Sequence, residues 1–146
     1  MAAFKVYSLI MENNTTSESN TKYYKVVFES SDNCLWSSWT ADSSLVVEYK
    51  LNEFVYPKLK KSKLFVFADF SEAMSYCGNM EKLRIYECEV LNPVIGRKMS
   101  NNSRLSIIIE FWNNETILTN QSNIVVNCPW KTVFCDGVKL VKKIDN

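Results

Sequence analysis

The alternation of hydrophobic and polar residues is clearest over residues 63–93, where it predicts a strand, a helix and a second strand in close succession. Residues 64–67, LFVF, form a short apolar run of the residue types that suit a half-buried pleated surface. Asp69 is a good N-cap for the helix that follows, and Gly78 is placed to end that helix in the left-handed conformation. From residue 83 the period becomes two, which puts alternate side chains on opposite faces of a strand. One face carries Leu83, Ile85, Glu87 and Glu89, and the other carries Arg84, Tyr86, Cys88 and Val90.

Shorter runs on both sides of this unit predict further strands. They cover residues 1–11, 23–29, 34–39, 45–49, 54–56, 117–118 and 124–126, with a last hairpin of 133–135 and 138–141 turned at Asp136-Gly137. Residues 105–112 are almost continuously apolar, as in a central strand that is covered on both faces. Residues 11–22 are polar and predict a flexible loop. The whole pattern predicts one α+β domain over residues 1–146, a strand-dominated, curved, mostly antiparallel sheet of about eight short strands with one main helix packed on one face.

Composition and charge narrow the class of protein. The chain has 146 residues, of which 47% are hydrophobic and 23% charged, so it can bury a core of ordinary size. A formal net charge of +1 gives no net attraction to nucleic acid or to an anionic membrane, so neither is an expected partner. No apolar stretch approaches the ~20 residues that span a bilayer. Five cysteines, an odd number without CxxC spacing, are expected to be reduced, mostly buried thiols of a cytoplasmic protein.

The absence of histidine removes several catalytic and metal-binding arrangements at once. Ser-His-Asp and Cys-His nucleophile pairs and His-based zinc sites all need that side chain, which is also the commonest general base near neutral pH. The three glycines are isolated, so there is no glycine-rich phosphate loop either. We therefore expect a protein without a cofactor, a metal site or a recognisable catalytic constellation, and the sequence leans away from an enzyme.

Glu87 and Glu89 offer an alternative, enzymatic interpretation. Residues two apart on a strand share a face, and two adjacent carboxylates can raise the pKa of one of them for acid–base chemistry. A Glu-x-Glu on a strand resembles the ADP-ribosyltransferases, with residues 37–40 in the place of their earlier Ser-containing strand. The chain departs from their pattern because no Arg precedes Arg84 and no His is present. An exposed strand face with alternating charges is the simpler interpretation.

Basic and aromatic side chains form the candidate ligand-binding set. Arg and Lys bind phosphates through charge-assisted hydrogen bonds, and planar aromatic rings stack on nucleobases. These residue types are more often solvated surface groups or core residues, so the set makes a site only if its members converge in the fold. It consists of Arg84, Arg97, Lys98 and Arg104 for phosphate groups and of Trp36 and Trp39 for stacking.

Three stretches of the chain together resemble a group of small proteins of tailed phages, giant viruses and their hosts. They are residues 49–77 (YKLNEFVYPKLKKSKLFVFADFSEAMSYC), 83–93 (LRIYECEVLNP) and 129–144 (PWKTVFCDGVKLVKKI). The shared features are an extended segment ending at a proline, an apolar strand, a short helix, a strand of the ECEV-NP kind and a closing T-V-x-C-D-x-V-K-L segment. The similarity covers somewhat over a third of the chain and leaves residues 1–48 outside it.

The resemblance implies a viral accessory protein. Small phage proteins without catalytic residues often act against host defence, and some are sponges that sequester cyclic nucleotide or cyclic ADP-ribose signals at sites between subunits. The resemblance therefore implies a binding protein that sequesters a nucleotide-derived signal or a host defence protein without catalysis. Such a protein can be a homo-oligomer. Two alternatives stay open: a minimal ADP-ribosyltransferase-like enzyme that uses Glu87 and Glu89, and a protein-interaction module whose sheet edge docks a partner.

Overall fold

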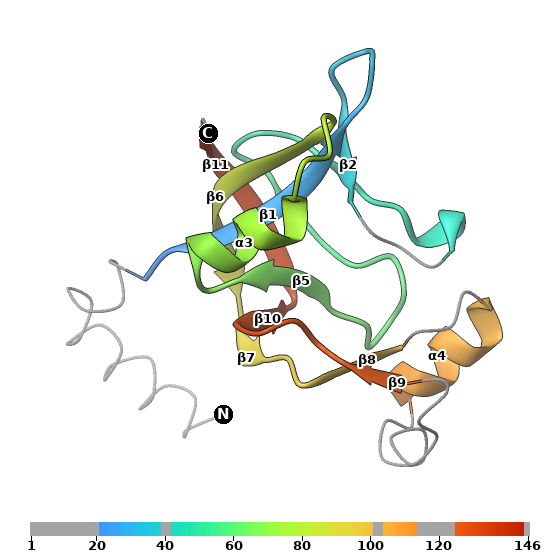
Figure 1. Ribbon diagram of the computed structural model, residues 1–146. Helices are drawn as coiled ribbons and strands as arrows, with labels where there is room; N and C mark the ends of the chain where they lie inside the picture. The colour runs from blue at the N-terminus through green and yellow to red at the C-terminus, as the bar shows by residue number, and fades with distance from the viewer. Residues whose placement is uncertain (1–20, 39–41, 101–103, 114–124, 145–146) are drawn as a thin grey trace, which may run out of the picture.

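A computed structural model describes residues 21–38, 42–100, 104–113 and 125–144 of the chain (Figure 1). Within these ranges eleven strands and two α-helices form an α+β fold that strands dominate, as predicted. Nine of the strands make one antiparallel sheet, and β8 and β9 make a separate two-stranded sheet. The strands predicted at 1–11 and 117–118, and most of the loop predicted at 11–22, lie outside the described residues.

The main sheet has the order β4-β11-β6-β1-β5-β10-β7, and β2 and β3 continue from β1 beside this path. The strands are β1 (Tyr23–Glu29), β2 (Leu35–Ser37), β3 (Glu48–Tyr49), β4 (Phe54–Val55), β5 (Leu64–Phe67), β6 (Leu83–Leu91), β7 (Val94–Ile95), β8 (Lys98–Ser100), β9 (Val125–Asn127), β10 (Thr132–Cys135) and β11 (Gly137–Ile144). The helices are α3 (Phe70–Cys77) and α4 (Leu105–Asn113). A short 3-10 helix, η1 (Ser43–Leu45), precedes β3, so the strand predicted at 45–49 is shorter than expected.

The central β5–α3–β6 unit confirms the predicted strand, helix and strand. The Asp69 carboxylate accepts a hydrogen bond from the Ser71 N–H at 2.8 Å, which caps the first turn of α3. Gly78 ends the helix at φ 54° and ψ −134°; φ is positive as predicted, but this ψ is not left-handed helical, and glycine tolerates the combination best. β5 and β6 both pair antiparallel with β1, which lies between them. The helix is therefore a crossover that passes over β1 (Figure 1).

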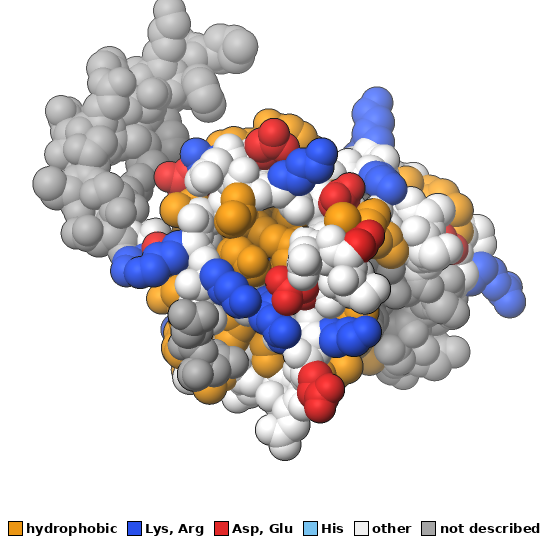
Figure 2. Space-filling view, turned by 90° about the horizontal axis from the view of Figure 1, so that it is seen from above, with side chains coloured by type: hydrophobic (Ala, Val, Ile, Leu, Met, Phe, Trp, Pro, Cys, Tyr) orange, Lys and Arg blue, Asp and Glu red, His pale blue; other side chains and the backbone are white. Residues whose placement is uncertain are grey.

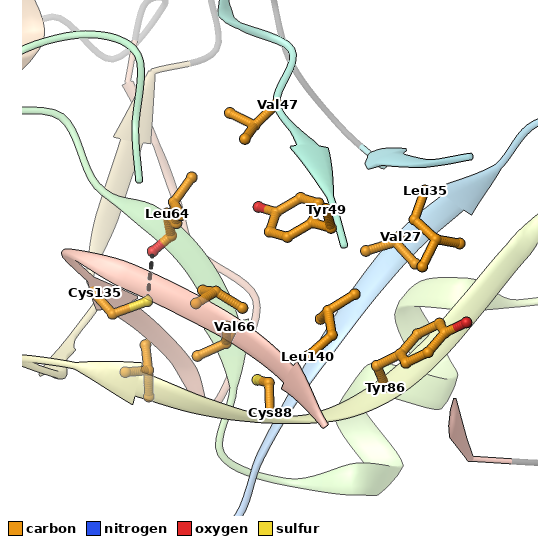
Figure 3. Close-up of a cluster of buried hydrophobic side chains, with 12 residues drawn as sticks. Val27, Leu35, Val47, Tyr49, Leu64, Val66, Tyr86, Cys88, Cys135 and Leu140 are labelled. Atoms are coloured by element: carbon orange, nitrogen blue, oxygen red, sulfur yellow. Dashed lines mark hydrogen bonds between the residues drawn. The ribbon is translucent and has the colours of Figure 1, made fainter. Parts of the chain in front are cut away.

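Both faces of β6 are covered, and its side chains enter two hydrophobic clusters. On one face Leu83 and Ile85 pack under α3 against Ala73 and Cys77. On the other face the Tyr49 ring lies among side chains from several strands (Figure 3). This second cluster contains Val27, Leu35, Val47, Tyr49, Leu64, Val66, Tyr86, Cys88, Val133, Cys135, Val138 and Leu140. The alternation predicted from residue 83 onward is thus confirmed.

The apolar run predicted as a central strand is a helix, α4, so that prediction was wrong. A short apolar run is compatible with either structure, because periodicity alone does not separate a buried strand from a buried helix. In α4 the buried side chains are Ile108 and Phe111, three residues apart on one face. Trp112, the next residue, packs against Phe65 of β5 and Phe134 of β10, with ring centroids 6.2 Å and 5.6 Å away. These aromatic contacts fasten α4 to the main sheet.

The hairpin predicted at Asp136-Gly137 was also wrong. β10 and β11 are strands, but β10 pairs with β5 and β7, whereas β11 pairs with β6 and β4. Asp136 forms the corner between them, and its carboxylate accepts hydrogen bonds from Lys63 Nζ at 2.5 Å and Asn92 Nδ2 at 2.9 Å. Gly137 keeps this corner tight, because a Cβ there would lie 2.9 Å from the Leu91 side chain. One residue thus joins strands near opposite ends of the sheet, which requires the strong curvature that the sequence predicts.

The surface combines charged groups with scattered apolar ones. Seen from above, hydrophobic side chains lie in the middle of one face, with Lys, Arg, Asp and Glu side chains around them (Figure 2). The largest exposed fractions among hydrophobic residues belong to Ile95, Trp130 and Met80. No helix among the described residues is long and apolar enough to cross a membrane.

Candidate functional site

The candidate site lies where one edge of β1 changes its partner. The other edge of β1 pairs with β6 over almost its whole length. On the first edge, Tyr24 pairs with Phe67 of β5, whereas from Val27 onward β1 pairs with β2. β5 and β2 therefore diverge from β1 between these two points, and we call this gap the β1 fork. Lys25 and Val26 occupy the β1 fork.

A cavity of about 390 Å³ opens beside the β1 fork. Its volume falls within the range of roughly 300–1,000 Å³ that small-molecule sites occupy. β1, β2, β3 and β5 contribute to its wall, as do β8, β9 and α4. The described residues of the wall include no Asp or Glu. The main sheet and the smaller lobe of β8, β9 and α4 thus enclose a space without acidic groups.

Most of the cavity wall is apolar. Ile108 and Trp112 come from α4, Met99 from β8, Val126 from β9 and Phe65 from β5. Burying apolar ligand surface against such side chains is favourable by roughly 25 cal/mol per Å². The wall therefore suits the hydrocarbon or aromatic body of a ligand.

Lys25 brings an amine into this apolar surrounding. The residue is 8% exposed; its Nζ donates a hydrogen bond to the Phe65 carbonyl at 2.6 Å and lies 5.5 Å from the centroid of the Tyr49 ring. No described carboxylate forms an ion pair with it. Burial lowers the pKa of Lys25, because the ammonium form loses its hydration. The hydrogen bond to Phe65 uses one of its donors, so a buried amine remains with unused hydrogen-bonding capacity.

The thiols near Lys25 do not supply a counter-charge. All five cysteines are free, as predicted, and Cys88 and Cys135 are buried in the same cluster as Tyr49. Burial raises the pKa of Cys88 to about 12 and that of Cys135 to about 11. Cys135 donates a weak hydrogen bond to the Leu64 carbonyl at 3.5 Å (Figure 3). Both thiols therefore stay neutral at physiological pH.

Tyr49 presents a second polar group to the cavity. The residue is 2% exposed, and its hydroxyl has no hydrogen-bond partner within the part of the chain that the structure describes. A buried polar group left unpaired costs about 1–3 kcal/mol, and native proteins contain few of them. Burial raises the pKa of Tyr49, and the Ser37 side chain opposes that shift. The Ser37 hydroxyl accepts a hydrogen bond from the Val47 N–H at 3.0 Å and donates one to the Val47 carbonyl at 3.4 Å, and it is not within hydrogen-bonding geometry of the Tyr49 hydroxyl.

A second lysine in the wall, Lys63, is already compensated. Its Nζ lies 2.5 Å from an Asp136 carboxylate oxygen. Both lysines line one cavity, and among the described residues a carboxylate partner is found for Lys63 and not for Lys25. Lys25 is therefore the buried amine of this wall that a ligand could bind.

The structure does not bring the predicted ligand-binding residues together. Arg84 pairs in register with Val27, whereas Trp36 pairs with Phe28, so their side chains lie on opposite faces of the sheet. Neither side chain lines the cavity. Arg84 instead forms an ion pair with Glu29, with Nε and Oε1 3.3 Å apart.

Arg97, Lys98 and Arg104 lie in or next to β8 and α4, whereas Trp36 lies in β2. Lys98 comes nearest to the cavity, because its Nζ donates to Oδ1 of Asn127 at 2.6 Å and Asn127 is part of the wall. Arg97 and Arg104 are exposed and do not line the cavity. Trp39 lies outside the described residues.

Glu87 and Glu89 each have their own lysine partner. Oε1 of Glu87 lies 3.2 Å from Nζ of Lys22, and Oε2 of Glu89 lies 2.5 Å from Nζ of Lys139. Neither glutamate lines the cavity. This arrangement fits the simpler interpretation, a strand face with alternating charges that form ion pairs.

Lys25 and Tyr49 were missing from the predicted set, although Lys25 leaves a signal in the sequence. In the strand YYKVVFE it is two residues from Val27, whose side chain faces the core. A lysine at a strand position whose side chain faces the core is rare unless it has a partner or a function. Tyr49 leaves no such signal, because an aromatic residue in a strand is ordinary core.

Comparison with known proteins assigns no family, since no protein-family model, no curated protein and no solved structure matches the chain. Among the described residues, no group of three or more His, Cys, Asp or Glu side chains could hold a metal ion.

Proposed function

We propose that the protein binds and sequesters a small amphipathic ligand in the cavity beside the β1 fork. The ligand has an apolar body and one head group with an acceptor oxygen, a carbonyl or a carboxylate. One observation carries this proposal: the amine of Lys25, without a carboxylate partner, and the hydroxyl of Tyr49, without a hydrogen-bond partner among the described residues, are both buried in the wall of one largely apolar cavity. A head group between them would accept a hydrogen bond from each.

The energetics favour this mode of binding. A hydrogen bond to a charged or strongly polar partner contributes about 1.5–3 kcal/mol, and satisfying the Tyr49 hydroxyl removes a desolvation penalty of about 1–3 kcal/mol. The apolar body adds the burial of its surface against Ile108, Trp112 and their neighbours. Such a ligand therefore meets the polar and the apolar requirements of the cavity at once.

The composition of the wall supports binding without turnover. The chain contains no His, and the described wall contains no Asp or Glu that could serve as a general base. A nucleotide-derived signal with several phosphates would need several cations, and one of the two lysines here is already paired. The geometry therefore favours a less highly charged ligand than a nucleotide.

Sequestration agrees with the viral, anti-defence role that the resemblance to phage proteins implies. That role, the host partner, homo-oligomer formation, the cytoplasmic location and the interaction-module alternative all remain predictions.

A thermal-shift panel tests the proposal. It contains octanoate, decanoate, dodecanoate, the corresponding methyl ketones, NAD, ADP-ribose and cyclic dinucleotides. A ligand at ~100 times its dissociation constant adds about 2.7 kcal/mol to the unfolding free energy, which raises Tm by several degrees. We expect a shift with the fatty acids or ketones, with the ligand recovered unchanged after denaturation.

Variants show whether such a shift arises in the cavity. Lys25→Met should abolish it, whereas Lys139→Met, which removes a lysine paired with Glu89 outside the cavity, should leave it intact. A shift with the nucleotides alone would replace this proposal with nucleotide sequestration. No shift with any member of the panel, or an equal shift in both variants, would refute binding in this cavity.

A further inference from the structure

Lys25 is placed to react with a ligand as well as to bind it. We propose that Lys25 forms a reversible imine with ligands whose head group is an aldehyde, so that the protein captures apolar aldehydes covalently beside the β1 fork. This inference rests on the proposed binding function and specifies the head group.

The geometry leaves the reactive electron pair of Lys25 available. A neutral amine has two N–H donors and one lone pair, and one N–H of Lys25 is directed to the Phe65 carbonyl. That hydrogen bond holds the amine in the wall and leaves its lone pair for a carbonyl carbon. The cavity has room beside this amine for an aldehyde with an apolar tail.

The surroundings of Lys25 favour the neutral, nucleophilic amine. No described carboxylate pairs with it, and the neighbouring thiols of Cys88 and Cys135 stay protonated because burial raises the pKa of both. Burial also lowers the pKa of Lys25 itself. An unperturbed lysine side chain has a pKa near 10.4 and is almost wholly protonated at neutral pH. Lysines that act as nucleophiles in proteins are activated by the same kind of desolvation.

The reaction balances without an oxidant, a reductant or a further reactant. The Nζ lone pair forms a C–N bond to the aldehyde carbon, the carbonyl π electrons move to oxygen, and a proton passes from nitrogen to that oxygen to give a carbinolamine. The carbinolamine then loses its hydroxyl and a nitrogen proton as water, and a C=N bond forms. The Tyr49 hydroxyl, lacking a partner of its own, can donate a hydrogen bond to the oxygen while negative charge develops on it.

Reductive trapping tests this inference on the full-length protein. Octanal is added below the protein concentration at neutral pH with sodium cyanoborohydride, and the modified residue is located by peptide mass spectrometry. The trapped product gains the mass of the aldehyde less one oxygen atom. We expect the yield at Lys25 to exceed that at any surface lysine, since a lowered pKa raises the neutral, nucleophilic fraction of the amine. Urea-unfolded protein should lose this selectivity.

Arginine at position 25 separates covalent capture from binding. Lys25→Arg keeps a hydrogen-bond donor but has no nucleophilic amine, so the selective adduct should disappear, whereas Lys139→Met should keep it. Octanal distributed evenly over the surface lysines of the native protein would overturn the inference. If decanoate still raised Tm in that case, the binding function would stand and imine formation alone would be refuted. If decanoate gave no Tm shift and octanal no selective adduct, the binding function and imine formation would both be refuted.

Discussion

Tyr49→Phe is expected to stabilise the protein while weakening its ligand binding. The substitution removes one hydroxyl from a side chain that is 2% exposed, and that hydroxyl has no partner among the described residues. Because a buried, unpaired polar group costs about 1–3 kcal/mol, its removal should raise the unfolding free energy by about 1 kcal/mol or more. For a domain of this size, that corresponds to an increase in Tm of roughly 3–5 °C. Urea titration and thermal unfolding, both without ligand, measure the change.

The same substitution should reduce the affinity for decanoate by about tenfold, because it removes a hydrogen bond worth about 1.4 kcal/mol in the complex. Tyr86→Phe is the matched control: Tyr86 belongs to the same cluster, and its hydroxyl is not a buried group without a partner. The control should therefore not raise the unfolding free energy, because it relieves no unpaired polar group. A typical hydrogen bond within a protein contributes about 1 kcal/mol to stability. If Tyr49→Phe instead lowers the unfolding free energy by about that amount or more, the hydroxyl is already bonded within the protein and is not available to a ligand.

Two further predictions concern charge and backbone. Burial lowers the pKa of Lys25 below 10.5, its ordinary value in the unfolded chain. Between the lowered pKa and 10.5 the unfolded chain binds more protons than the folded one, so the unfolding free energy should rise with pH there. Lys25→Met should lack this contribution, so the slope of the unfolding free energy against pH, measured by urea titrations below pH 10.5, should be smaller in the variant than in the native protein, whereas thiol ionisation affects both proteins alike; an identical slope in both proteins would contradict the burial of Lys25. Gly96→Ala should lower the unfolding free energy by about 1–3 kcal/mol, because its Cβ would lie 2.5 Å from Cε1 of Phe134. A Gly96→Ala variant that unfolds at the native urea midpoint would show that this contact is not tight.

The central unit was predictable because local signals there agree with the fold. Asp69 supplies a cap that depends only on its immediate neighbours, and the alternation after residue 83 records a strand whose two faces are both covered. β1 was predicted with the observed bounds because aromatic and β-branched residues, which favour strands, make up most of it and turn-forming residues follow at Ser30.

The errors arose where structure depends on distant parts of the chain. The apolar run of α4 fits a strand or a helix, and the choice is made by Trp112 packing on Phe65 and Phe134. The Asp136-Gly137 pair has the composition of a hairpin turn, but Lys63 holds Asp136 at a corner between two sheet partners. The cavity was not predictable either, because it exists only where β1 exchanges β5 for β2, and sequence gives no register between those strands.

The most direct test of the account is to locate a bound ligand by nuclear magnetic resonance. Protein carrying labelled methyl groups is mixed with unlabelled decanoate, and intermolecular nuclear Overhauser effects are recorded. The account predicts contacts from the ligand chain to the methyl groups of Ile108, Met99 and Val126, which line the cavity, and none to those of Ile95 or Val141, which are exposed elsewhere. Contacts confined to Ile95 or Val141, or no contacts at saturating decanoate, would contradict it.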